Sequence, residues 1–296
     1  MSRRQNLERH RHSLAEIRGI MNSMKSLAYM ETRKLARFLD AQHAVVEGIE
    51  TVAADLLSFH PDILPASREL RPLYLLIGSE RGFCGDFNHR LMTQLESLLG
   101  TRPADNVSLV AVGHKLHQLF ESSPYQATLV DGISVADEAT SLLNQLLDLL
   151  IRLEGEQGVD SLYCLYHQGE TGLVLRRLFP PFGNLTQSAG TFSHPPLLYQ
   201  TPAEFLLSLT EQYLFATLHE IIFDSLMAEN QQRVSHMEGA VRHLDETETK
   251  LTHQCNTLRQ EEIIEEIEVI LLSALPPDHT DAAQTTTART SPQPPG

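Results

Sequence analysis

The residues whose types and spacing best suit chemistry lie in one glycine-bearing segment, Gly78 to Asn88, which reads G-S-E-R-G-F-C-G-D-F-N. An apolar run that predicts a buried strand precedes it, and an amphipathic run that predicts a helix follows it. Backbone N–H groups at such a junction can bind a phosphate. However, the spacing is neither G-x-G-x-x-G nor G-x-x-x-x-G-K-[ST], and the segment has no lysine to reach a phosphate. The simpler interpretation is a tight turn whose glycines adopt positive φ and which can contact a partner protein.

Three other groups of residues could supply catalytic or metal chemistry. Cys84 could be a nucleophile, but apart from His89 no base or orienting residue surrounds it in the sequence. His114 and His117 have the spacing of a metal pair on a helix, yet no carboxylate or cysteine falls at a supporting position. The acidic run at 261–268 interleaves with isoleucines, which is typical of one apolar seam with solvated acidic faces. We therefore assign no catalytic residue, cofactor ligand or metal ligand, and an interaction protein is favoured over an enzyme.

Composition sets the broad class of the protein. The chain has 296 residues, of which 42% are hydrophobic and 21% charged, and this is ordinary for a globular protein. Its net charge of −15 argues against non-specific binding to nucleic acid or to anionic lipid. Three widely spaced cysteines predict neither a disulfide framework nor a C-x-x-C site, so we expect a reducing, cytosol-facing environment. No apolar run approaches the roughly 18 residues of a membrane span, and no secretory signal is expected.

Proline and glycine are distributed unevenly, and this predicts two long helices. Residues 1–60 contain no proline, and residues 203–274 contain no proline and a single glycine, Gly239. Apolar residues recur at heptad spacing in both segments, as in a helix pair wound on itself. In the N-terminal segment the expected columns are Leu14, Met21, Ala28, Leu35, Gln42 and Ile49, and Ile17, Met24, Glu31, Phe38, Val45 and Val52. In the C-terminal segment they are Val234, Val241, Glu248 and Cys255, and Met237, Leu244, Leu251 and Leu258, followed by a shift to Ile263, Ile267, Ile270 and Ala274.

Charge favours the pairing of these two segments. Residues 1–50 carry nine basic and six acidic side chains, whereas residues 204–274 carry four basic and fourteen acidic ones. The opposite net charges attract the segments, although each exposed ion pair contributes only about 0 to 1 kcal/mol. We therefore expect charge to set the register of a long antiparallel coiled coil more than its stability.

The middle of the chain predicts a compact α/β domain with a Rossmann-like, mostly parallel sheet. Apolar runs alternate with amphipathic runs, which is the pattern of parallel strands joined by crossover helices. The expected strands are 73–77, 107–112 and 161–166, and the expected helices are 87–99, 115–121 and 134–153. The expected boundaries are an N-terminal coiled-coil helix at 1–60, the α/β domain at 70–195, a C-terminal coiled-coil helix at 200–275 and a disordered, Pro- and Thr-rich tail at 276–296.

Several motifs make the chain similar to a known family. The run R-P-L-Y-L-L-I-G-S-E-R-G-F-C-G-D-F-N, ending at Asn88, resembles the S-D-R-G-L-C-G-G-L-N that follows the first strand in gamma subunits of F-type ATP synthases. L-M-A-E-N-Q-Q-R, ending at Arg233, resembles the family's L-A-S-E-q-a-a-R, and Thr257 to Gln260 stands where the family has N-K-x-R-Q. The lead into the last helix, from His194, is also similar. The resemblance covers about residues 7–275 and includes the order of elements, a long helix, an α/β domain and a longer returning helix.

Two departures from the family pattern stand out. The family's I-T-K-A-M appears as Ser23 to Leu27, which keeps Lys25 but has Leu27 in place of the methionine. The family's I-T-x-E signature appears as Ile263 to Glu266, without the hydroxyl group. Together with the Pro-rich tail, these departures suggest a divergent branch, such as the N-ATPase type found beside an ordinary synthase in some bacteria.

The resemblance implies a non-catalytic rotor without a cofactor, peripheral at the cytoplasmic face of the bacterial plasma membrane. The coiled coil would turn inside a ring of alpha and beta subunits and couple ion flow through a membrane c ring to ATP synthesis or hydrolysis. It would neither bind nucleic acid nor insert into the membrane. The implied contacts with the catalytic ring are Lys25, Leu27, Arg233, Arg259, Gln260 and Glu266, and those with the epsilon subunit and the c ring are Arg81, Gly82, Phe83, Cys84, Gly85 and Asn88.

Two other functions fit the same residues. A nucleotide-binding regulatory protein with a coiled-coil arm would use the segment that begins at Gly78 and would bind ATP or a dinucleotide. A free-standing coiled-coil scaffold would be stable alone as a homodimer, whereas a rotor shaft pairs with itself and leaves apolar surface that needs partners.

Overall fold

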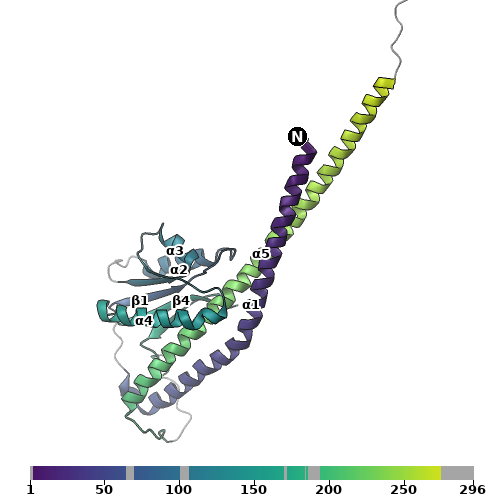
Figure 1. The fold of residues 1–296 in the computed structure, drawn as a ribbon. Helices are drawn as coiled ribbons and strands as arrows, with labels where there is room; N and C mark the ends of the chain where they lie inside the picture. Colours follow the sequence, from purple (N-terminus) through teal and green to yellow (C-terminus); the bar gives the residue numbers. More distant parts are fainter. Residues whose placement is uncertain are drawn as a thin grey trace, which may run out of the picture. The chain divides into compact units, whose positions relative to one another are not determined.

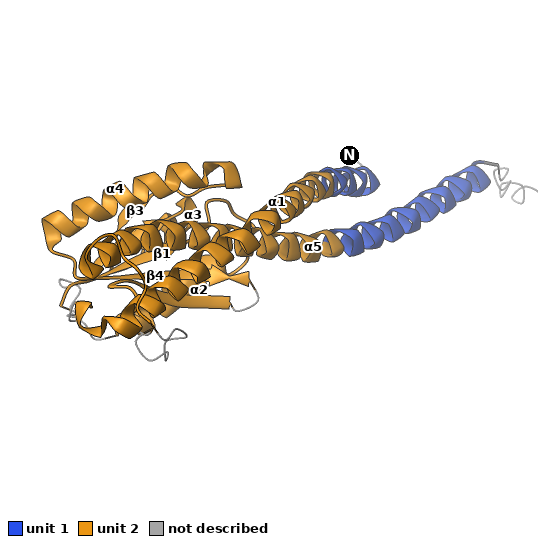
Figure 2. Cartoon of the chain, turned by 90° about the horizontal axis from the view of Figure 1, so that it is seen from below, with its two compact units in different colours: residues 1–16, 244–296 blue, residues 17–243 orange. Residues whose placement is uncertain are grey.

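The computed structural model describes residues 3–64, 70–100, 107–169, 172–183, 185 and 194–274. The chain forms two compact units, residues 17–243 and residues 1–16 with 244–296, which Figure 2 colours separately. The tail at 276–296, for which we expect disorder, lies outside the described residues.

A five-stranded sheet forms the centre of the unit at residues 17–243. Its strands are β1 (Pro72–Ile77), β2 (Ser108–Val112), β3 (Thr128–Val130), β4 (Ser161–Gln168) and β5 (Gly172–Phe179), in the spatial order β3-β2-β1-β4-β5. The first four strands run parallel, and β5 pairs antiparallel with β4. The helices between the strands are α2 (Phe87–Leu99), α3 (His114–Phe120) and α4 (Ala139–Gln157), the last preceded by a short 3-10 turn, Ala136–Glu138. The expected α/β domain with a mostly parallel sheet is confirmed.

The sheet is covered on both faces, so the side chains of β1 are buried throughout. Leu73, Leu75 and Ile77 point into a core shared with α4 and the two long helices, and the alternate residues Tyr74 and Leu76 point into a second core with α2 and α3. This alternation is the period of two that a strand imposes. Figure 1 shows α2 and α3 on one face of the sheet and α4 on the other.

Sequence patterns failed to predict two edge strands. β3 has only three residues, and its side chains are mostly exposed, so it lacks an apolar run. β5 contains Arg176 and Arg177, which interrupt its apolar pattern. The expected helix at 134–153 begins later, at Ala139, because the 3-10 turn takes up the residues before it.

Two long helices carry the chain beyond the sheet. They are α1 (Arg3–Phe59), which is followed by a 3-10 turn at Pro61–Ile63, and α5 (Pro202–Ala274). Within residues 17–243 they run antiparallel, and the Gln42 side-chain amide donates to the carbonyl of Ala216 over 2.9 Å. The long antiparallel coiled coil expected from the heptads is therefore present. Within the described residues, no helix is apolar enough over a sufficient length to cross a bilayer.

One of the expected heptad columns in α1 is wrong. Ala28 and Leu35 are buried as expected, but Ile17, Phe38, Val45 and Val52 of the second column are between 44% and 51% exposed. The buried residues beside the first column are instead Leu39, Val46 and Ala53. The expected column and the column that contains Leu39, Val46 and Ala53 are both largely apolar, and heptad spacing led to the wrong one. The helix packs Leu39, Val46 and Ala53 inside and leaves the expected column as an exposed apolar stripe.

In α5 the two expected columns around Met237, Leu251 and Cys255 are confirmed, because these residues are buried and the other members are at least partly covered. The expected continuation through Ile263, Ile267 and Ile270 is not a packed seam, since all three are about half exposed or more. Within the unit that holds residues 3–16 and 244–274, Arg4 on α1 pairs with Glu262 on α5 over 3.1 Å, so the contact beside Ile263 is an ion pair and not an apolar seam.

Candidate partner-contact sites

The segment 79–88 links the carboxyl end of β1 to α2, and its shape is fixed by side chains within it. Asn88 is 8% exposed; its Oδ1 accepts from the Ser79 backbone N–H over 2.9 Å, and its Nδ2 donates to the Ser79 hydroxyl over 2.8 Å. The Cys84 thiol donates to the same hydroxyl over 3.2 Å. Phe83 and Gly85 have positive φ values of 64° and 62°. This left-handed conformation is ordinary for Gly85 but uncommon for a residue such as Phe83. We call residues 79–88 the β1–α2 loop.

A buried ion pair on α5 also holds the β1–α2 loop in place. Arg233 is 6% exposed and donates from Nε to the carbonyl of Gly82 over 3.2 Å and from Nη2 to the carbonyl of Arg81 over 3.4 Å. One turn earlier, Glu229 is 3% exposed and pairs with the Arg233 guanidinium. Burial raises the pKa of Glu229, while Arg233 and the backbone N–H groups of Arg81 and Glu80 oppose that shift. Helix α5 thus binds both the carbonyl and the N–H groups of the loop.

The loop is also tied to its neighbours across the sheet edge. Glu80 accepts hydrogen bonds from the backbone N–H groups of Gly132, at 2.8 Å, and His114, at 3.0 Å. The N–H of Lys115 donates to the carbonyl of Ser79 over 3.1 Å. Sequence reasoning missed Glu80 and Glu229 as loop-holding residues. The only available signal was the spacing of Glu229 and Arg233, four residues apart on a helix.

The β1–α2 loop divides into exposed and buried residues. Arg81, Phe83 and Gly85 are exposed, and the Phe83 side chain is 53% accessible. Cys84 and Asn88 are buried, and Gly82 is partly covered. Burial raises the pKa of the Cys84 thiol, which disfavours the thiolate that a nucleophile needs. The loop therefore presents these three residues and the exposed Asp86 to a partner, while its buried members hold its shape.

The expected contact role of Arg233 needs correction. We expected this residue on the outside of a shaft, but its guanidinium is buried and bonded to Glu229, to the Asn230 side chain at 2.8 Å and to two loop carbonyls. A side chain used in this way is not available to a second protein. Arg233 instead fixes the β1–α2 loop on α5.

The remaining expected contact residues lie on the two long helices and belong to different units of the chain. Lys25 is partly covered and Leu27 is 63% exposed, both on the part of α1 that belongs to residues 17–243. Arg259, Gln260 and Glu266 are exposed on α5, within the unit that contains residues 244–274.

The geometry disfavours the nucleotide-binding alternative. The backbone N–H groups of Gly78 and Ser79, which a phosphate would need, already donate to the Val112 carbonyl and to Asn88 Oδ1, both over 2.9 Å. A Cβ placed at Gly78 would lie 2.6 Å from the Leu116 Cβ, so this glycine is required by close packing. At Gly113, which has a φ of 106°, a Cβ would meet the backbone oxygen of Ser79 at 2.8 Å. The glycines at this sheet edge serve close packing of backbone on backbone.

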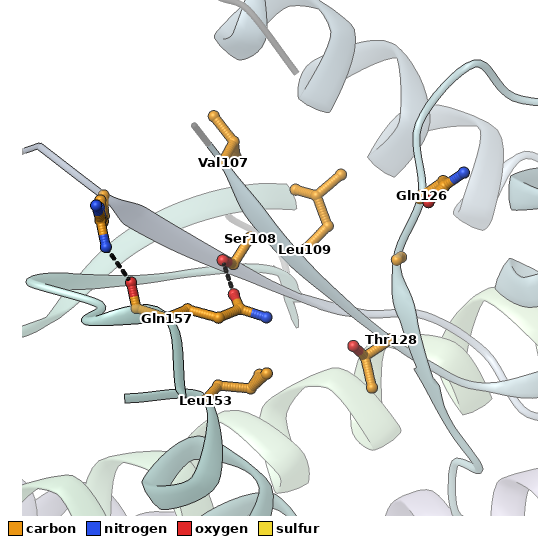
Figure 3. Close-up of a pocket in the computed structure, with 9 residues that line it drawn as sticks. Val107, Ser108, Leu109, Gln126, Thr128, Leu153 and Gln157 are labelled. Carbon is orange, nitrogen blue, oxygen red and sulfur yellow. Dashed lines mark hydrogen bonds between the residues drawn. The ribbon is translucent and has the colours of Figure 1, made fainter. Parts of the chain in front are cut away.

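A cavity lies at the other end of the parallel strands, away from the β1–α2 loop. It has a volume of about 580 Å³ and is lined by residues at the amino ends of the parallel strands, including Ser108 and Thr128 (Figure 3). The Arg71 guanidinium donates to the Gln157 carbonyl over 2.8 Å, and the Ser108 hydroxyl bonds to the Gln157 side chain. Ligands of open parallel sheets bind at the carboxyl ends instead. This cavity therefore has the wrong position for a nucleotide site.

Comparison with known proteins decides the family. A family model described as ATP synthase matches residues 3–274. The chain belongs to the ATP synthase family. Among curated members, the ATP synthase gamma chain of Halothermothrix orenii is 25% identical over 92% of this chain and 98% of its own length. The gamma chain of Caldanaerobacter subterraneus subsp. tengcongensis is 21% identical over 88% of this chain and 96% of its own.

A solved structure of the ATP synthase family shares the fold. The rotor of the mitochondrial ATP synthase of Euglena gracilis, in rotational state 1, contains a chain that aligns with a TM-score of 0.61. The identity is 14%, and the alignment covers 88% of this chain and 98% of that one. Membership of the ATP synthase family therefore rests on sequence, and the structure shows that the fold agrees over nearly the same span.

Proposed function

We propose that the chain is the central rotor shaft of an F-type ATP synthase, a non-catalytic subunit that couples ion flow through a membrane c ring to the conformational cycle of the catalytic alpha/beta ring. The observation that carries the proposal is the match to gamma chains over almost the whole length of both proteins. The paired helices α1 and α5 on either side of an α/β domain in the sequence agree with it. As working boundaries we keep the shaft at 1–60 and 200–275 and the α/β domain at 70–195.

The end of α5 supports a role inside a larger assembly. Seven large apolar side chains there are between 46% and 70% exposed, namely Ile263, Ile264, Ile267, Val269, Ile270, Leu271 and Leu272. An apolar surface of this kind on a free chain indicates a protein-binding region. We assign it, with the exposed Arg259, Gln260 and Glu266, to contact with the alpha/beta ring.

The α1 residues of the proposed ring contact are Lys25 and Leu27. Leu27 is 63% exposed, although a leucine on a paired helix normally packs in the seam. The apolar stripe of Ile17, Phe38, Val45 and Val52 is exposed along the same helix. We assign Lys25 and Leu27 to the ring and leave Arg233 out of the contact, because it is buried within the chain.

The β1–α2 loop is the proposed contact with the epsilon subunit and the c ring. Its exposed Arg81, Phe83 and Gly85 would touch the partner, and Gly82, Cys84 and Asn88 would hold the loop in the required shape. In a bacterial cell the complex would place this protein at the cytoplasmic face of the plasma membrane, without direct insertion. Nucleotide chemistry would reside in the partner subunits.

Reconstitution with cognate alpha and beta subunits tests the shaft. The full chain should yield a complex with ATPase activity, and a chain truncated after Leu258 should lose most of that activity because it lacks the proposed ring contact. A chain truncated after Ala274 is the matched control and should behave like the full chain. Recovery of the full chain alone, monodisperse and without alpha or beta, would refute the proposal.

A second experiment tests the loop. Phe83→Ser should weaken binding of the epsilon subunit to the purified full chain by at least tenfold, whereas Leu70→Ser, at a residue 72% exposed just before β1, should leave it unchanged. Equal affinities of the two variants in calorimetric titrations would remove the β1–α2 loop from the epsilon contact.

A further inference from the structure

Three potential metal ligands meet where α1 faces α5 within residues 17–243. The Nε2 atom of His43 lies 3.3 Å from Oδ1 of Asp224 and 3.6 Å from Oε1 of Glu220. One ligand atom from each residue lies within 4.8 Å of both others. Glu220 and Asp224 are four residues apart on α5 and share one face of the helix, whereas His43 comes from α1. Among the described residues, no other such group of three occurs.

The outer oxygen of each carboxylate is held by a separate donor. The Gln168 side-chain amide, at the end of β4, donates to Oδ2 of Asp224 over 3.0 Å. Arg176, on β5, donates from Nη1 to Oε2 of Glu220 over 2.6 Å. Each carboxylate therefore turns its other oxygen toward His43. Such donors orient the ligands in protein metal sites and hold them in place.

The cluster carries more negative than positive charge. Glu220 and Asp224 are only 8% and 6% exposed at their side chains, and burial raises the pKa of both. Arg176 is shared, because it also pairs with Glu50 over 3.0 Å. Asp224 is bonded by the neutral amide of Gln168 and by His43. A cation in contact with both inner carboxylate oxygens would compensate charges that the fold has removed from water.

We propose that His43, Glu220 and Asp224 form a binding site for one divalent transition-metal ion, with zinc the best match. In tetrahedral zinc coordination at about 2.0 to 2.1 Å, neighbouring ligand atoms are about 3.4 Å apart, close to both distances from His43 Nε2. An imidazole with two carboxylates suits zinc better than calcium or magnesium, which prefer oxygen ligands alone. The His43 side chain is 43% exposed, which gives the ion a path from solvent and a water as fourth ligand.

The site would fasten α1 to α5 and to the edge of the sheet at one point. Without a metal, the same three residues are held together only by the contacts of His43 Nε2 with the two carboxylates, at 3.3 and 3.6 Å. The two arrangements differ in a measurable way, because only the first binds one equivalent of zinc with affinity that depends on all three side chains.

Zinc and cobalt titrations of the purified full chain distinguish the two arrangements. The chain should bind one equivalent of Zn²⁺ in competition with a chromophoric chelator, and Co²⁺ in its place should give the visible absorption of a four-coordinate ion. His43→Gln and Asp224→Asn should each lower the affinity at least a hundredfold. Gln168→Met, which removes only the donor to Asp224, should lower it about 10- to 100-fold.

Matched controls separate the site from the many other histidines and from misfolding. His219→Gln changes the residue beside Glu220 on α5, and Glu50→Gln changes the carboxylate that shares Arg176; both should keep the single equivalent. Circular dichroism spectra of all variants should match that of the native chain. The proposal fails if the native chain shows no stoichiometric binding, or if His43→Gln and Asp224→Asn bind as tightly as the two controls.

Discussion

At the scale of one residue, Arg233 shows that burial can turn an expected surface contact into an internal structural role. On the sequence it is one of four basic residues in a strongly acidic helix, which suggests a surface contact. In the structure it is enclosed with Glu229 and bonded to carbonyls of the β1–α2 loop. A buried ion pair contributes little net stability when intact, but removal of one partner leaves an uncompensated charge.

Arg233→Met should therefore reduce the free energy of unfolding by about 3 to 5 kcal/mol, since Glu229 and two carbonyls lose their donor. Arg242→Met, at an exposed arginine of the same helix, should change it by no more than about 0.5 kcal/mol. Urea denaturation of the two variants and the native chain measures both values. Equal losses would show that the buried pair does not hold the loop.

His167 provides a pH-dependent prediction. Its ring stacks on Phe87 at 4.0 Å and its Nε2 lies 2.9 Å from the Phe87 carbonyl, while burial lowers the pKa of the imidazole. The stability that this residue contributes is thus present above the usual histidine pKa of about 6.5 and is lost as the pH falls through the lower folded value. Denaturation at pH 7 and pH 5 should show a larger loss in the native chain than in His167→Gln. An NMR titration of the ring that gave a pKa above 6.5 would contradict this.

The site residues were only partly predictable. The β1–α2 loop could be recognised because its glycines and its place after an apolar run are local features. The grouping of Glu80, Glu229 and Arg233, and that of His43 with Asp224, depends on residues far apart in the chain, the latter pair by 181 positions. No spacing rule relates such residues before the fold is known.

At the scale of elements, the helix pair and the central strands were predictable because each repeats its apolar residues at the period of its backbone. The boundaries of α2 agree with the expected range 87–99, and β1 begins one residue before the expected strand. The buried face of α1 was not predictable from the sequence, because Val45 and Val46, like Phe38 and Leu39, are adjacent apolar residues on different faces of the helix. The sequence permits either face to pack, and the position of α5 and the sheet decides between them.

This ambiguity yields a matched pair of variants. Val46 is 2% exposed and Val45 is 51% exposed, so Val46→Ala should cost about 2 kcal/mol of unfolding free energy and Val45→Ala less than about 0.5 kcal/mol. Thermal unfolding of the isolated chain measures the difference. A larger effect at Val45 would restore the heptad column expected from the sequence.

Two glycines should respond in opposite ways to substitution by alanine. Gly239 lies within α5, and a Cβ there would meet no heavy atom within 4 Å, so Gly239→Ala should stabilise the chain by about 0.5 to 1 kcal/mol. Gly113→Ala should destabilise it, because a Cβ would lie 2.9 Å or less from backbone atoms of Gly78 and Ser79 and the φ is positive. Melting temperatures of the two variants on either side of the native value would agree with this, and a lower value for Gly239→Ala would not.

At the scale of the whole molecule, burial is concentrated in one part of α5. Between Ala216 and Asn230 nearly every side chain is buried, whereas from Arg259 onward the described side chains are exposed apart from partly covered Glu262. Local opening of a helix requires less free energy where few apolar contacts hold it. Amide hydrogen exchange should therefore be slowest at 216–230 and much faster at 259–273. In a reconstituted complex the second region should become protected; unchanged exchange there would argue against its assignment to the ring contact.

The burial of 216–230 has a mechanical consequence. Side chains on all sides of this stretch of α5 are buried against the rest of the unit. The Ser225 hydroxyl donates to the Ile77 carbonyl over 3.4 Å, and beyond the end of the stretch Arg233 donates to the Gly82 carbonyl of the β1–α2 loop. The α/β domain cannot slip around the helix without breaking these contacts together, so a torque applied at Phe83 would reach α5 with little lost motion.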